Sequence, residues 1–158
     1  MKKLALINQR FIKAAQNNQI DKLKNLLSQG ADIHTDNDFV LRYSAGYGHL
    51  ETVKLLFAQG ANIHANDDEA LRESAYYGHL EIVKFLLEHG ANIHANDDEA
   101  LKNSTLNKHY DVWQALSAFI QEKRLLVAAS NSIQELSSVE SAPKTKRPSI
   151  TITKRSKI

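Results

Sequence analysis

Apolar side chains recur along the chain at the spacing of short amphipathic helices. Within residues 68–90 they fall in two groups: Leu71 and Ala75, then Leu80, Val83, Leu86 and Leu87. Steps of three and four place each group on one helical face. Gly78 and Gly90 follow the two groups, and glycine favours the positive φ at which helices end. The pattern predicts a unit made of helix, turn, helix and connector.

This unit recurs every 30 residues. The stretch from Gly60 to Leu71 returns letter for letter at 90–101 and in a looser form at 30–41. Internal repetition at a fixed step is the signature of a repeat protein. Because each helix has one apolar face and cannot bury it alone, the units must stack. We therefore expect an all-α solenoid of about four stacked units with short connectors.

The first and last units depart from the pattern, as end units of an array do. We expect an N-terminal capping unit at about 4–30, repeats at 31–60 and 61–90, and a C-terminal unit at 91–129. Lys108 replaces the glycine of the turn, and Ile120 stands where a fourth Gly is due, which predicts a last helix from about Tyr110 to about Ala129. A capping box at 132–135 predicts a separate short helix that ends near residue 140.

Composition adds limits to this picture. Hydrophobic residues make up 42% and charged residues 24% of the 158 positions, which is ordinary for a globular protein. There is no cysteine, so disulfide scaffolds and thiolate chemistry are excluded. No run approaches the roughly 20 apolar residues of a membrane span, and we expect a cytoplasmic protein.

Charge separates the body from the tail. The net charge of +2 divides into −2 before residue 130 and +4 from there on. Residues 130–158 are rich in Ser, then in Pro and basic residues, a composition that buries too little apolar surface to fold alone. We expect a mostly disordered tail over residues 130–158, with disorder from about residue 142.

Two nine-residue segments carry a resemblance to a known family. Residues 48–56 (GHLETVKLL) and 78–86 (GHLEIVKFL), each followed by Gly-Ala-Asn-Ile, resemble the ankyrin repeat over about Phe11 to Ile120. The family unit usually has 33 residues and opens with Thr-Pro-Leu-His, whereas this one has 30 and lacks that opening. We therefore expect short fingers with a tight turn at residues 66–68, and expect Asp68 and Asp98 to cap the first helices.

The resemblance implies a non-catalytic module that binds a protein partner through the concave face of the first helices and the finger tips. Carried onto this chain, the candidate contact residues are Tyr47, Tyr76, Tyr77, Asn107, Arg42, Arg72, Asn37, Asn66, Asp67, Asn96 and Asp97. Tyrosine is frequent among interface residues that carry binding energy. The alternative for the three tyrosines is packing between neighbouring units.

Other chemistry finds little support in the sequence. His34, His64 and His94 are equivalent positions of successive units, and stacked helices lie roughly 8–10 Å apart. Nitrogen ligands of one zinc ion must lie roughly 3–4 Å from each other, so we expect structural histidines and no metal. The chain also lacks a phosphate-binding loop and a catalytic triad. We expect no enzyme, no cofactor and no small-molecule substrate.

The basic tail supports an alternative function. Lys154, Arg155 and Lys157 fit a nuclear import pattern, and Ser149 follows basic residues as a kinase site does. The chain would then be a nuclear or nucleic-acid-associated protein that acts through its tail, with the repeats as scaffold. No aromatic residue interleaves the basic ones, so such contact with anions or nucleic acid would be weak and non-specific. A merely solvated basic tail is the simpler interpretation.

Overall fold

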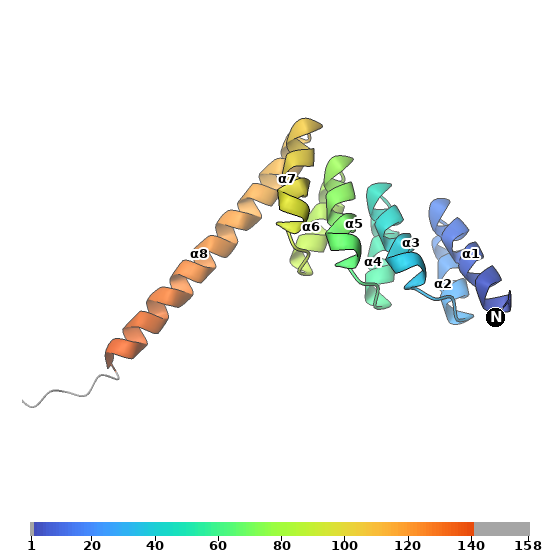
Figure 1. Ribbon diagram of the computed structural model, residues 1–158, viewed down its shortest axis with the longest axis horizontal. Helices are drawn as coiled ribbons and strands as arrows, with labels where there is room; N and C mark the ends of the chain where they lie inside the picture. Colours follow the sequence, from blue (N-terminus) through green and yellow to red (C-terminus); the bar gives the residue numbers. More distant parts are fainter. Residues whose placement is uncertain (1, 141–158) are drawn as a thin grey trace, which may run out of the picture. The chain divides into compact units, whose positions relative to one another are not determined.

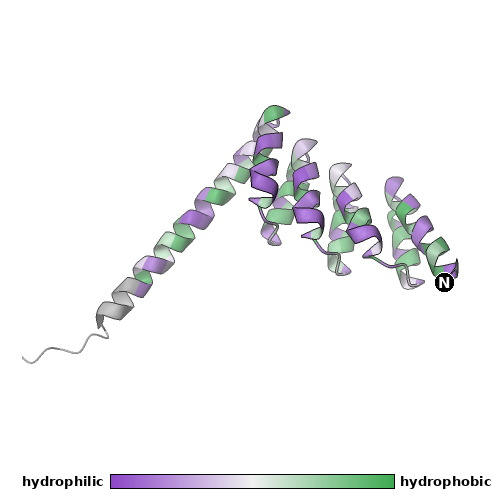
Figure 2. Ribbon diagram, in the orientation of Figure 1, coloured by the Kyte–Doolittle hydropathy of each residue, from purple (hydrophilic) through white to green (hydrophobic). Residues whose placement is uncertain are grey.

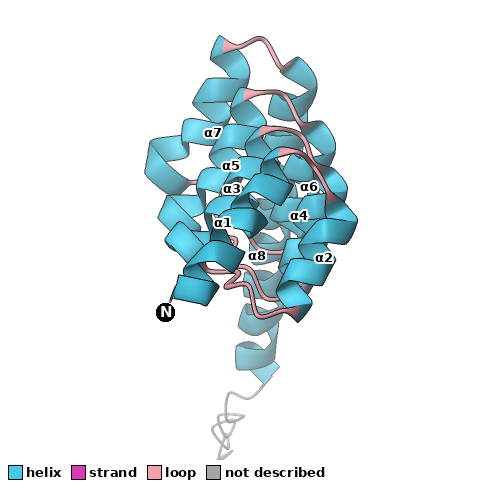
Figure 3. Ribbon diagram, turned by 90° about the vertical axis from the view of Figure 1, so that its right-hand side faces the viewer, coloured by secondary structure: helices cyan, strands magenta, loops and turns pink. Residues whose placement is uncertain are grey.

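The described part of the chain is entirely helical. The computed structural model describes the backbone of residues 2–140 and the side chains of residues 3–134. The helices are α1 (Lys2–Gln16), α2 (Ile20–Ser28), α3 (Thr35–Gly46), α4 (Leu50–Ala58), α5 (Ala65–Tyr76), α6 (Leu80–Glu88), α7 (Ala95–Leu106) and α8 (Tyr110–Glu140). Within residues 2–140 there is no strand (Figure 3). The all-α prediction is confirmed.

The helices form stacked pairs. α1 contacts α2, α3 contacts α4, and α5 contacts α6. The first helices of the pairs lie side by side in the order α1, α3, α5, α7, and α4 lies beside α6 in a second row (Figures 1 and 3). This arrangement is the helix-turn-helix solenoid that the 30-residue period predicts.

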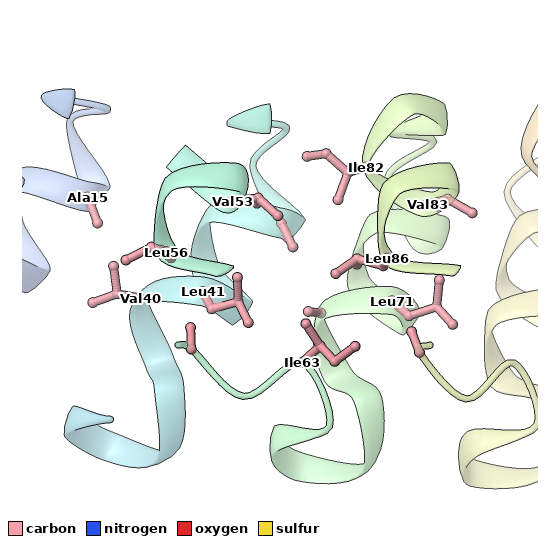
Figure 4. Close-up of a cluster of buried hydrophobic side chains, with 14 of the residues drawn as sticks. Ala15, Val40, Leu41, Val53, Leu56, Ile63, Leu71, Ile82, Val83 and Leu86 are labelled. Carbon is pink, nitrogen blue, oxygen red and sulfur yellow. The ribbon is translucent and has the colours of Figure 1, made fainter. Parts of the chain in front are cut away.

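The core lies between successive pairs. Buried aliphatic side chains of α3, α4, α5 and α6 fill these layers (Figure 4): Val40, Leu41, Val53, Leu56, Leu71, Ile82, Val83 and Leu86. At the N-terminal end, Phe11, Ala15 and Leu23 are equally buried, as their register predicts. Each fully buried aliphatic side chain stabilises the fold by about 1.5–3 kcal/mol, so most of the stability comes from the contact between units.

The last helix differs from its prediction. Contacts divide the chain into two compact units between Gln121 and Glu122, and α8 begins in the first unit and continues in the second as far as Glu140. The expected end near Ala129 and a separate short helix after Ser132 are therefore wrong. Residues 110–140 contain neither Gly nor Pro to interrupt a helix. The Ser132 hydroxyl donates to the Ala128 carbonyl at 3.0 Å, a bond made inside a helix. The predicted disorder from residue 142 falls outside the described residues.

Each connector ends in one turn of left-handed backbone. Residues 66–68 have φ of 51°, 55° and 54°, and residues 36–38 and 96–98 repeat this conformation. All nine positions are Asn or Asp, the non-glycine residues that adopt the left-handed region most readily. The tight turn predicted at 66–68 is confirmed, and the polar ends of α3, α5 and α7 are purple in Figure 2.

Two glycines of the helix–helix turns are required for two reasons. Gly48 and Gly78 both have φ of +77°, which disfavours a side chain. A Cβ at Gly48 would also lie 2.7 Å from the His79 ring, and one at Gly78 would lie 2.4 Å from the His109 ring. These histidines belong to the following unit, so each glycine lets the next unit approach.

Candidate functional site

The buried aspartates of the connectors join one repeat to the next. Oδ1 of Asp38 accepts a hydrogen bond from the Asn62 backbone N–H at 2.9 Å, and Oδ1 of Asp68 accepts one from the Asn92 N–H at 2.8 Å. The ring of His64 lies 3.0 Å from the same Asp68 oxygen. The expectation that Asp68 and Asp98 cap their own helices is wrong, because the Asp68 carboxylate is directed to the next repeat and that of Asp98 faces the His94 ring. We call the two bonds between repeats, Asp38 to the Asn62 N–H and Asp68 to the Asn92 N–H, the aspartate latch.

The arginines proposed as contact residues are held within the fold. The Arg42 guanidinium donates to Glu69 of the next repeat at 2.7 Å and to the carbonyls of Asp36 and Asn37. Arg72 makes the equivalent bonds to Glu99 and to the carbonyls of its own connector. The donors of both arginines are engaged within the fold, and their side chains are largely buried. The arginines therefore stabilise the connectors and have few donors left for a partner.

The other finger residues lie at the surface. The side chains of Asn37, Asn66, Asp67, Asn96 and Asp97 are exposed. Asn37 donates to Asn66 of the next finger, and Asn66 donates to Glu69 at 2.9 Å. The finger tips therefore form a polar row in which the first two tips touch through Asn37 and Asn66.

Three tyrosines stand at the C-terminal ends of the first helices α3 and α5. Tyr47, Tyr76 and Tyr77 are 61%, 42% and 53% exposed. The rings are ordered by their neighbours, because Tyr47 stacks on Tyr43 with centroids 4.1 Å apart and Tyr76 meets Tyr77 edge to face at 4.9 Å. Asn107, at the equivalent place after α7, is half-buried and donates to the Asn103 carbonyl at 3.0 Å. Exposed, ordered aromatic surface thus gathers on α3 and α5.

A hollow of about 140 Å³ lies between α3 and α5, beside these tyrosines. Its lining from α3 includes Phe39, Tyr43, Gly46 and Tyr47, and its lining from α5 includes Glu69, Glu73 and Tyr77. We call it the α3–α5 hollow. Sequence reasoning missed Tyr43 and Glu73, and it placed Gly46 on the concave face without a role. The available signal was Gly46 itself, because the equivalent residues 76 and 106 are Tyr and Leu.

Glu73 is a half-buried acid of the hollow. Burial raises the pKa of its carboxyl group, the charges of Glu69 and Glu99 raise this pKa further, and Arg72 lowers it. No described side chain donates a hydrogen bond to this carboxylate. Burial also raises the pKa of the Tyr43 hydroxyl, and the neighbouring Tyr47 raises it further through a hydrogen bond and through its charge. The hollow therefore holds a half-buried carboxylate among tyrosine rings.

A second, more apolar depression lies at the end of the stack. Leu101, Lys102, Thr105, Leu106 and Trp113 line it, together with Asp98. Leu106 and Trp113 are exposed, and no further repeat covers α7 within the described residues. It is the surface that a fifth unit would cover.

The histidines take structural positions. His34, His64 and His94 each face the aspartate four residues on, and the His79 ring bonds to the Gly46 carbonyl at 2.9 Å. Among the described residues no group of three or more His, Cys, Asp or Glu side chains could hold a metal ion. In the same part of the chain, none of the helices combines the length and apolar character needed to cross a bilayer. Ser149 and the basic residues of the tail lie outside the described residues.

Comparison with known proteins agrees with this geometry. The family model for ankyrin repeats in three copies matches residues 11–97, which is more than half of the 158 residues. No curated protein matches the chain at a significant level. Ankyrin repeats generally act as protein-binding scaffolds. By its sequence match and its stacked helix pairs, the chain belongs to the ankyrin-repeat family.

Proposed function

We propose that the protein is a non-catalytic binding module that engages a protein partner through the first-helix face and the finger tips. By first-helix face we mean the exposed side chains of α3 and α5 around Tyr47, Tyr76 and Tyr77. The single observation that carries the proposal is the exposure of these three ordered rings. Large apolar rings left in water are typical of surfaces that bind other proteins.

The polar finger row completes this surface. Exposed Asn and Asp side chains lie at the N-terminal ends of α3 and α5, and the tyrosines lie at the C-terminal ends of the same helices. The surface therefore combines polar and aromatic parts, as protein interfaces do. The rings lose little conformational freedom on binding, because Tyr43 and Tyr77 already order Tyr47 and Tyr76.

Affinity capture with matched variants tests the proposal. The full chain is immobilised, captured proteins are identified, and the affinity of the best ligand is then measured with purified components. We expect Tyr76→Ala/Tyr77→Ala to weaken binding by at least roughly tenfold, the scale of a binding hot spot. Tyr110→Ala, which removes an exposed tyrosine from the start of α8, serves as the control.

Two outcomes would contradict the proposal. If wild type and the double variant bind equally, the tyrosines are not part of the contact. If deletion of residues 142–158 abolishes binding and added salt does the same, the basic tail is the binding element and the alternative nuclear or nucleic-acid function takes precedence.

A further inference from the structure

We propose that the α3–α5 hollow receives one cationic side chain, a lysine or an arginine, of the bound protein. The inference deepens the proposed function, on which it rests, by stating the chemistry of the partner at one point of the contact. It is carried by the coincidence of a small concavity, tyrosine rings and an unpaired carboxylate.

The size of the hollow suits the end of a side chain. Its volume of about 140 Å³ is well below the roughly 300–1,000 Å³ of sites for small-molecule ligands. The space exists because residue 46 is glycine. A Cβ placed there would stand 3.4 Å from Glu73 Cβ and 3.8 Å from Glu73 Oε2, so any larger side chain would grow into the place beside the carboxylate.

The charges inside the hollow call for a cation. Arg42 and Glu69 both line the hollow and are paired with each other, and Arg72 is bound to Glu99, so neither arginine is hydrogen-bonded to Glu73. Glu73 is left half-buried with no hydrogen-bond donor among the described side chains. A carboxylate taken from water without a partner is unfavourable, and an arriving ammonium or guanidinium group would replace the missing donor. An acidic side chain would be repelled.

The aromatic wall favours the same occupant. Tyr43, Tyr47 and Tyr77 line the hollow together with Glu73. Cations within about 6 Å of a tyrosine ring are attracted to its electron-rich face, and the aliphatic stem of a lysine or arginine can cover apolar ring surface. A neutral aliphatic side chain would gain only the second of these contacts.

The next pair of first helices does not repeat this combination. Between α5 and α7 the place of Gly46 is taken by Tyr76, that of Glu73 by Asn103 and that of Tyr77 by Asn107. The hollow therefore follows from the particular residues of two units and not from the repeat pattern, and the chain supplies its own comparison site.

The proposal can be tested with small probes that need no identified partner. The full-length chain, labelled with ¹⁵N, is titrated with Nα-acetyl-lysine methylamide, with the arginine analogue and with the neutral norleucine analogue. We expect saturable shifts at the amides of residues 43, 46, 47, 73 and 77 with either cation and none with norleucine. Because no partner protein is used, failure here is distinct from failure of the capture experiment.

Two variants and a control locate the effect. Glu73→Gln keeps the shape of the side chain and removes its charge, and we expect it to weaken binding of both cations by roughly tenfold or more. Gly46→Leu fills the hollow and should abolish binding, with thermal unfolding used to confirm that it is folded. Glu81→Gln removes one charge from α6 of the same repeat, where Glu81 pairs with Lys84, and should leave binding unchanged.

Three results would overturn the proposal. Equal binding of norleucine would make the hollow merely apolar, and unchanged cation binding in Glu73→Gln would remove the role of the carboxylate. If replacing Lys144, Lys146 and Arg147 by Ala shifts the same hollow amides without any probe, a basic segment of the chain itself occupies the site in place of a partner.

Discussion

Two stretches of this protein have the same twelve letters and different surroundings. Residues 60–71 and 90–101 are identical, and both form a connector with the start of a first helix. The Asp68 side chain is 6% exposed, whereas that of Asp98 is 49% exposed. Leu71 is buried and Leu101 only half-buried. The letters within the two stretches are the same, and among the described residues a further repeat follows only the first, so the letters of the stretch alone do not decide burial.

The glycines of the helix–helix turns also depend on the following repeat, and here the residue itself differs between repeats. Gly48 and Gly78 must admit a histidine ring of the following unit, but the equivalent position in the last unit is Lys108 with φ of 63°. A lysine can adopt a left-handed backbone at some cost in energy. A lysine at Gly48 or Gly78 would in addition place its Cβ within 3 Å of a histidine ring. The first turn has Asn18 with φ of 50°, although a further unit follows it. Glycine is therefore required at Gly48 and Gly78 by the histidine rings that approach them and not at every turn that has a following unit.

The largest predicted difference concerns the leucines. Leu71→Ala should lower the free energy of unfolding by about 3 kcal/mol, because it leaves a cavity between two units. Leu101→Ala should lower it by about 1.5 kcal/mol or less, because the half-exposed site loses less buried area. Urea unfolding followed by circular dichroism measures both. Equal losses in the free energy of unfolding would show that Leu101 is packed as tightly as Leu71, and would contradict the difference in burial between the two stretches.

The aspartate latch should give the next largest difference. Asp68→Ala removes the buried carboxylate that accepts from the Asn92 N–H and should cost about 2 kcal/mol, within the range for a hydrogen bond to a charged group. Asp98→Ala removes a carboxylate that, among the described residues, faces only His94, and should cost less than about 0.5 kcal/mol. The same unfolding measurement compares the two variants. A large loss for Asp98→Ala would mean that its carboxylate has a partner equivalent to Asn92.

Features that depend on local sequence could be predicted from the sequence, and features that depend on contacts between repeats could not. The 30-residue period, the apolar steps around Leu71 and the run of Asn and Asp at 66–68 are local signals, and they predict the helices, the stacking and the turn. The role of Asp68 depends on a backbone N–H 24 residues away, which local capping rules do not contain. Tyr43 and Glu73 form a hollow only because two helices meet across Gly46. The composition after Ala129, rich in serine, does not predict the continuation of α8, although residues 110–140 contain no Gly or Pro that would end a helix.

A pH experiment examines the histidine that the stack buries. Burial lowers the pKa of His49, and the neighbouring charge of His79 lowers it further, while its Nδ1 has no hydrogen-bond partner among the described residues. Below the unfolded pKa of about 6.5 the unfolded chain binds the proton more readily, so stability is present above that pH and is lost as pH falls. We expect the melting temperature to drop between about pH 7.5 and about pH 5.5, and to drop less in His49→Gln. An unchanged slope in this variant would assign the acid sensitivity to other groups.

The smallest predicted effect is the difference in stability between glycine and alanine at residues 67 and 97. This difference should be equal in both stretches, so it serves as a control on the comparison. Asp67 and Asp97 are both exposed and have nearly the same left-handed backbone, with φ of 55° and 57°. Alanine is disfavoured there and glycine is not, so each Gly variant should be more stable than the matching Ala variant by about 1 kcal/mol. Because this difference arises within one residue, a neighbouring repeat should not alter it, and thermal unfolding of the four variants measures it. If the Gly–Ala difference at residue 67 greatly exceeded that at residue 97, the next repeat would be enforcing the turn, and the conformation could not be ascribed to the Asn and Asp run alone.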